Sequence, residues 1–180
     1  MQKSVKILLL LAVILVISLI AKSLIAANRL QIEDISDLLP RNGQYPTRSL
    51  ASIKTVVIHH SGVEGQTAWD YALYHVNSNS WPGIGYHYVI EKNGSVKQTN
   101  PLTNASYHVA AHNAYTIGIS LSGNFNQTQA TQAQISSLKK LLSHLSSLLA
   151  RDFNVVGHRD LGNTTCPGHN FYPLIDSLWQ

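Results

Sequence analysis

The pattern of apolar and polar positions changes several times along the chain and divides it into parts. An unbroken apolar run, relieved only by one serine, covers residues 7–21 directly after a basic N-terminus. It has no polar face, so it predicts a hydrophobic targeting or anchoring helix and not a helix of the core. Residues 28–50 mix charges with proline and glycine, which is typical of a linker. We therefore expect a signal anchor or signal peptide over residues 1–27, a linker over 28–50 and one folded domain over 51–180.

Within the domain, the apolar pattern alternates between the period of strands and the period of helices. Strands are expected over residues 55–60, 86–91, 115–123 and 154–158, and helices from residue 67, over 131–151 and over 174–178. Asn93-Gly94 predicts the turn of a hairpin. In the first helix, apolar residues at helical spacing are expected to face the core. These residues are Trp69, Ala72, Leu73 and Val76.

Strands separated by helices predict an α/β fold, and the hairpin adds an antiparallel pair of strands. We expect a single domain whose central mixed β-sheet is flanked by helices on both faces, preceded by the N-terminal hydrophobic helix. A chain of 180 residues is long enough for one such domain and too short for two of ordinary size.

The charge of the chain adds little to this picture. Lys3, Lys6 and Lys22 belong to the targeting segment, and the other basic residues nearly balance the 9 acidic ones. A protein that binds nucleic acid usually shows a clustered basic face, so we expect no nucleic-acid partner. A membrane is expected as a partner only through the N-terminal segment, if that segment is not cleaved.

The chain holds one cysteine, Cys166, in the stretch GHRDLGNTTCPG. In an exported protein a single cysteine is a dimer bridge, an inert buried thiol, a nucleophile or a metal ligand. His158, eight residues earlier, is a second zinc ligand type, and an irregular loop can bring both to one ion. A third ligand is available at the end of the first strand, where His59 and His60 point to opposite faces. Spacing alone does not choose between them.

Four motifs carry a resemblance to a known family. In order along the chain they are VVIHHSG, GYHYVIEKNG, YHVAAHNAYTIGISLSG and GHRDLGNTTCPG. They resemble the type-2 N-acetylmuramoyl-L-alanine amidase family, which includes phage lysozyme-amidases and animal peptidoglycan recognition proteins. The resemblance covers about residues 53–179.

Carried over position by position, the resemblance implies a zinc ion bound by His59, His158 and Cys166. It also implies that Tyr86 and Thr164 are catalytic, with hydroxyls near the scissile carbonyl. His108 and Asn113 match positions near the cleft, with no firm role.

The activity that the resemblance implies is hydrolysis of the amide between the lactyl group of N-acetylmuramic acid and L-alanine, in peptidoglycan or a muropeptide. The expected location is outside the cytoplasm, membrane-anchored by one helix, or secreted or periplasmic if the signal is cleaved. One alternative is a non-catalytic peptidoglycan-binding receptor, although such relatives typically lose the cysteine ligand. Another is a cysteine peptidase with Cys166 as nucleophile and His158 as base, for which no oxyanion partner is evident.

Overall fold

The computed structural model describes residues 11, 13–20 and 29–179. They fall into two units, residues 1–30 and residues 31–180. In the first unit, residues 11 and 13–20 are helical, and most of the predicted targeting segment lies outside the described residues. No described helix combines the length and the apolar character that crossing a membrane requires.

The second unit holds strands, two longer helices and several short helical turns. The strands are β1 (Ile32–Asp34), β2 (Thr55–His60), β3 (Tyr88–Ile90), β4 (Val96–Gln98), β5 (Thr116–Leu121) and β6 (Asn154–Gly157). The α-helices are α2 (Ala68–Asn77), α3 (Gln132–Leu149) and α4 (Ile175–Leu178). The 3-10 turns are η1 (Leu50–Ser52), η2 (Asn113–Tyr115), η3 (His158–Asp160) and η4 (Tyr172–Leu174).

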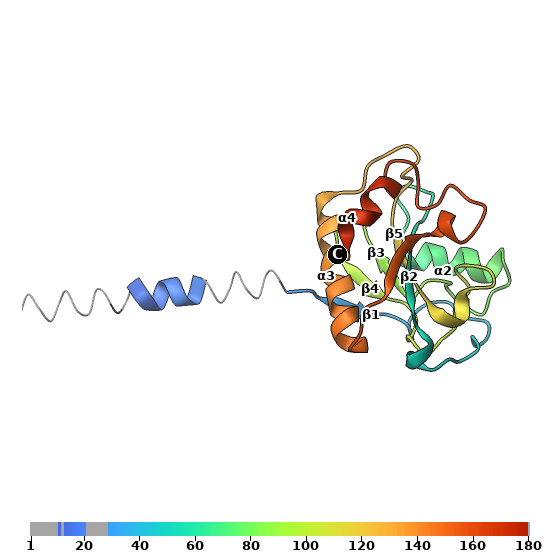
Figure 1. Ribbon diagram of the computed structural model, residues 1–180, viewed down its shortest axis with the longest axis horizontal. Coiled ribbons are helices and arrows are strands. Elements are labelled where there is room, and N and C mark those ends of the chain that lie inside the picture. The colour runs from blue at the N-terminus through green and yellow to red at the C-terminus, as the bar shows by residue number, and fades with distance from the viewer. Residues whose placement is uncertain (1–10, 12, 21–28, 180) are drawn as a thin grey trace, which may run out of the picture. The chain divides into compact units, whose positions relative to one another are not determined.

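Among the described residues, six strands form one sheet in the order β1-β4-β3-β5-β2-β6. The hairpin β3–β4 is antiparallel, and the other neighbouring pairs are parallel. Helix α2 lies on one side of the sheet, and α3 and α4 lie on the other (Figure 1). The expected α/β domain with a mixed central sheet is confirmed.

The two longest strands, β2 and β5, are neighbours in the sheet and are buried along their whole length. Helix α3 packs on the sheet and carries four leucines that are fully buried. These are Leu138, Leu141, Leu142 and Leu145. Each contributes on the order of 1.5–3 kcal/mol by leaving water. Gln134 closes the capping box of this helix with Thr131, and its side-chain amide also donates to the backbone oxygens of Ile90 and Ser122, at 3.2 and 2.9 Å.

The buried face of α2 agrees with the predicted one at Ala72 and differs from it at Trp69 and Leu73. Trp69 is 50% exposed and Leu73 is 38% exposed, while the buried residues are Ala68, Tyr71, Ala72 and His75. This stripe has the same helical spacing, shifted by one position. It can be buried because its polar atoms have partners: the Tyr71 hydroxyl donates to Gln66 O at 2.8 Å, and His75 Nδ1 accepts from Gly85 N at 3.0 Å.

Much of the segment expected as a linker, residues 28–50, packs on the folded unit. Strand β1 adds to the sheet by parallel pairing with β4. Further along, Tyr45 is buried, and its hydroxyl donates to Gly83 O at 2.6 Å. Arg41 donates to the backbone oxygens of Ser36 and Thr99. Except for the bond to Ser36, these contacts join residues that are distant in sequence, which is why the local composition does not reveal them.

Candidate metal centre

Two of the expected metal ligands come from parallel strands that end at the same edge of the sheet. His59 is the penultimate residue of β2, and His158 directly follows β6. Strands β2 and β6 are paired in parallel, with Ile58 opposite Gly157. The residue after Ile58 is His59 and the residue after Gly157 is His158, so the sheet register brings the two histidines side by side. The carboxyl ends of parallel strands are a common position for ligand sites.

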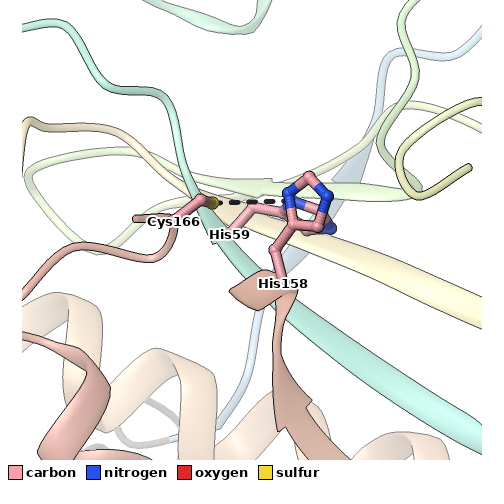
Figure 2. A group of neighbouring side chains, drawn as sticks. All are labelled: His59, His158 and Cys166. Atoms are coloured by element: carbon pink, nitrogen blue, oxygen red, sulfur yellow. Dashed lines mark hydrogen bonds between the residues drawn. The ribbon is translucent and has the colours of Figure 1, made fainter. Parts of the chain in front are cut away.

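Cys166 reaches the same place from the loop between η3 and η4. The N–H of Arg159 donates to Cys166 O at 2.9 Å, which closes the loop. The N–H of His60 donates to Cys166 Sγ at 3.4 Å, which holds the thiol against the end of β2. Figure 2 shows the sulfur directed at the His59 ring, with the His158 ring beside it.

The distances among the three side chains suit a single metal ion. Their ligand atoms all lie within 4.8 Å of one another. Cys166 Sγ is 3.7 Å from His59 Nδ1, and the ring centroids of His59 and His158 are 4.6 Å apart. Ligand atoms on a tetrahedral zinc ion are separated by about 3.3–3.6 Å, given the usual bond lengths. Two imidazoles and a thiol are also zinc's preferred donors, so the residues fit this metal.

Burial favours the neutral form of all three groups. It lowers the pKa of His59 well below its ordinary value and also lowers the pKa of His158, so both rings offer a lone pair. Burial raises the pKa of the Cys166 thiol to about 12 in the protein without metal. A bound zinc ion acts in the opposite direction and removes the thiol proton.

His60 faces away from this cluster. Its Nδ1 accepts from the N–H of Phe125 at 3.1 Å, and the two rings pack at 5.9 Å between centroids. Burial lowers the pKa of His60 to about 4. His59 is thus the member of the pair that lies with His158 and Cys166, while His60 belongs to the packing on the opposite face.

Tyr86 lies beside the cluster at the wall of a cavity. Its ring centroid is 5.3 Å from that of His59 and 5.4 Å from that of His75. Burial raises the pKa of its hydroxyl above the ordinary value, so the group stays protonated at neutral pH. The cavity has a volume of about 420 Å³ and is lined by Ser61, Val63, Gln66, Tyr71, Tyr74, His75 and Tyr86.

Thr164 is tied to the loop that carries the thiol. Its Oγ1 accepts from the N–H of Cys166 at 3.1 Å. The hydroxyl therefore uses a lone pair locally, and its proton can be donated to another group.

His108 contacts His59 directly and is not among the residues that line the cavity. It is buried, and its Nδ1 is 3.1 Å from His59 Nε2. Asn113, the other residue expected near the cleft, accepts from the N–H groups of His108 and Val109.

His75 lines this cavity, although the apolar spacing of the first helix predicts a buried stripe one position away from it. It packs on Tyr86 from α2, and burial lowers its pKa to about 4. The spacing of Ala68, Tyr71, Ala72 and His75 is also helical, so spacing alone does not choose between the two stripes of α2.

A second, larger cavity of about 540 Å³ lies at the N-terminal end of α2. Trp69, Glu91 and Lys92 are among its lining residues. The ligand candidates line neither cavity, but the smaller one adjoins them, because Tyr86 in its wall packs on the His59 ring.

Comparison with known proteins gives a consistent result. Residues 49–169 match the family described as N-acetylmuramoyl-L-alanine amidase. Peptidoglycan-recognition protein SC2 of Drosophila simulans is 36% identical over 104 residues, which cover 57% of this chain and 56% of that protein. The N-acetylmuramoyl-L-alanine amidase of Sus scrofa is 28% identical over 131 residues, which cover 66% of this chain and 22% of that protein. The chain thus spans about half the length of the first of these relatives and less of the second.

Among solved structures, the endolysin amidase LysCS from Clostridium intestinale URNW superposes with a TM-score of 0.69 at 27% sequence identity. The superposition covers 79% of this chain and 90% of that one. The shared region therefore includes most of the folded unit.

Proposed function

The chain belongs to the N-acetylmuramoyl-L-alanine amidase family, and we propose that it is a zinc-dependent amidase that cleaves the bond between the lactyl group of N-acetylmuramic acid and L-alanine in peptidoglycan. The resemblance carried by the four sequence motifs is confirmed by the family match. One observation carries the proposal: the ligand atoms of His59, His158 and Cys166 lie within 4.8 Å of one another. Within the described residues the cluster has three members. Three protein ligands are typical of catalytic zinc, whereas structural zinc usually has four.

The protein side chains prepare a position for the metal and for the scissile amide. A bound zinc ion supplies a Lewis acid that polarises a carbonyl group and lowers the pKa of water. His59 and His158 offer neutral imidazoles at this position, and Cys166 offers its sulfur. His59 is 1% exposed, so the protein shields one side of the position from bulk water.

Two hydroxyl groups are suited to the negative charge that develops on the carbonyl oxygen during hydrolysis. Tyr86 is protonated at neutral pH because burial raises its pKa, so its hydroxyl acts as a neutral donor. Thr164 lies two residues before the ligand Cys166, and the bond from the Cys166 N–H orients its hydroxyl. We assign Tyr86 and Thr164 as the donors that stabilise this charge.

A peptidoglycan-binding receptor without catalytic activity is the second candidate. It is favoured by the identity of 36% to a protein named for peptidoglycan recognition. A receptor needs the cavity but not the three ligands, and this chain has all three.

A cysteine peptidase is disfavoured by the surroundings of Cys166. A nucleophilic cysteine has a lowered pKa, in an electropositive and partly exposed position. Here burial raises the pKa of the thiol to about 12.

The proposed substrate lies outside the cytoplasmic membrane. The basic and apolar N-terminal segment predicts export to that side, either with the segment retained as an anchor or with it removed. We therefore propose an extracytoplasmic amidase whose folded domain includes residues 51–180.

The test is hydrolysis of purified peptidoglycan by the full chain in detergent. The zinc-loaded protein should release new N-terminal alanine amines. A chelator should stop the release, and added zinc should restore it. Cys166→Ser is the matched variant, since it replaces the thiol by a hydroxyl of similar size.

Each outcome separates the candidates. Release that survives complete removal of the metal contradicts the zinc mechanism. Binding of peptidoglycan by the zinc-loaded protein without any release of amines supports the receptor.

A further inference from the structure

A row of histidine rings begins at the half-buried His158 of the candidate metal centre and continues through the buried rings of His59, His108 and His87. The ring centroids are 4.6 Å apart between His158 and His59, 5.2 Å between His59 and His108, and 5.6 Å between His108 and His87. The first two belong to the ligand cluster. His108 does not, although it contacts one of the ligands directly.

The contacts of Thr116 with His108 show which nitrogen of the His108 ring carries the proton. The Thr116 hydroxyl donates to the backbone oxygen of His112 at 2.8 Å, and a carbonyl oxygen can only accept. Thr116 Oγ1 therefore accepts from His108 Nε2, which is 3.1 Å away, and this nitrogen carries the ring proton. The backbone oxygen of Thr116, at 3.4 Å from the same nitrogen, requires the same protonation.

The position of the proton on His108 also fixes the position of the proton on His59. With its proton on Nε2, a neutral His108 has only a lone pair on Nδ1. It can accept from His59 Nε2 at 3.1 Å, so His59 carries its own proton on Nε2. The remaining nitrogen, His59 Nδ1, then presents a lone pair toward Cys166 Sγ, 3.7 Å away. A metal ligand needs this tautomer.

The requirements of a metal ligand lead to the same assignment. A ring nitrogen that binds a metal carries no proton, so His59 as a ligand through Nδ1 keeps its proton on Nε2 and donates it to His108 Nδ1. One tautomer, with the proton on Nε2, thus satisfies both His59 and His108.

The position of His108 is fixed by its own contacts and by one glycine. The N–H groups of His108 and Val109 both donate to Asn113 Oδ1, at 3.1 and 2.9 Å. Gly118 on β5 leaves room for the ring, since a Cβ atom at this position would lie 2.5 Å from His108 Cγ. The His108 ring therefore rests directly on the backbone of the central sheet.

We propose that His108 is a positioning residue that fixes His59 in the tautomer and orientation needed to bind the metal through Nδ1. The proposal rests on the zinc site of the proposed function but requires no turnover. Partners that accept from the second nitrogen of a ligating histidine typically contribute 10- to 100-fold to metal affinity. Asn113 and Gly118 act on the same ring, through the backbone and by leaving space.

The first test needs no variant. The metal-free full chain, labelled with ¹⁵N in its histidines, should show the imidazole of His59 as a single neutral tautomer with the proton on Nε2. His59→Gln identifies the resonance by its loss. A proton on Nδ1, or a mixture of tautomers in the unmodified protein, overturns the proposal.

The second test compares two substitutions at one position. His108→Phe keeps a ring but has no acceptor, and it should weaken zinc binding by about 10- to 100-fold in competition with a chelator. His108→Asn places its Oδ1 near the former Nδ1 and should keep most of the affinity. His144→Phe, on the exposed side of α3, is the control for a histidine substitution without a role.

The outcomes are distinct from those of the amidase test. If His108→Phe folds and binds zinc as tightly as the unmodified protein, His108 only fills space and the proposal is wrong. If both His108 variants lose affinity equally, the accepting nitrogen is not what matters, and the proposal is also wrong. Tautomer and affinity are measured without peptidoglycan, so absence of hydrolysis would leave these results intact.

Discussion

Removing the hydroxyl of Tyr86 tests the proposed chemistry with the smallest change to the fold. Tyr86→Phe keeps the ring, which packs at 5.3 Å from His59 and 5.4 Å from His75 between centroids. The packing and the cavity wall should therefore persist. Tyr74→Phe is the matched control, because Tyr74 lines the same cavity but is 60% exposed.

The expected loss follows from the state of the hydroxyl. Burial raises the pKa of Tyr86, so the group is a neutral donor across the neutral pH range. A fixed donor gains strength as charge develops on the oxygen of the substrate, and removing one such donor costs on the order of 3 kcal/mol, which corresponds to roughly a hundredfold in kcat. The uncharged carbonyl of the bound substrate gains much less from the donor, so KM should change little.

The assay is the initial rate of alanine amine release from a soluble muropeptide, with zinc content measured on each sample. Tyr74→Phe should retain the kcat of the unmodified protein. A Tyr86→Phe protein with full zinc content and unchanged kcat would refute the assignment of this hydroxyl. A large increase in KM at unchanged kcat would refute it too, since it would show that the hydroxyl binds the substrate before the reaction begins.

Two further predictions concern the metal and the pH dependence of stability. Cys166→Ser should reduce the zinc content found by elemental analysis after dialysis, because a hydroxyl is a poorer zinc donor than a thiolate; zinc content equal to that of the unmodified chain would contradict the ligand assignment. His75 has a pKa of about 4 in the folded protein against an ordinary value of 6.5, so the unfolded chain binds its proton more readily and the free energy of unfolding falls as the pH drops from about 6.5 toward 4. By pH 5 this histidine should account for about 2 kcal/mol of the total loss. Urea unfolding at pH 7 and pH 5 should therefore show a loss about 2 kcal/mol smaller in His75→Gln than in the unmodified protein, and an unchanged loss in His144→Gln, whose site is exposed. Equal pH sensitivity in all three proteins would exclude His75 as a cause.

Features encoded within a few adjacent residues could be predicted from the sequence. The capping box of Thr131 and Gln134 lies at the start of α3 as expected. The turn at Asn93-Gly94 joins the antiparallel strands β3 and β4, with Gly94 at a φ of +87°. In both cases the interacting residues are three or four positions apart, so the short sequence pattern alone is enough to predict the interaction.

Features that depend on distant partners could not be predicted in this way. Strand β1 has three residues and no fully buried side chain, and only its pairing with β4 makes it a strand. In α2 the hydropathy pattern favours Trp69 for the core, but His75 is buried in its place. A buried histidine is stable there because Gly85 donates to it, and no local pattern indicates that bond.

The candidate metal centre combines both kinds of information. The types of the donors are visible in the sequence, because a histidine ends a buried strand and a lone cysteine sits in a polar loop. His59 and His158 lie side by side because β2 and β6 pair in parallel register. His59 and not His60 joins the cluster because its side chain is on the face of β2 where the Cys166 thiol lies. The orientation of the His59 ring depends in turn on His108, which contributes no metal ligand of its own. A substitution that disturbs this support should therefore weaken the metal site, even though His59, His158 and Cys166 all remain in place.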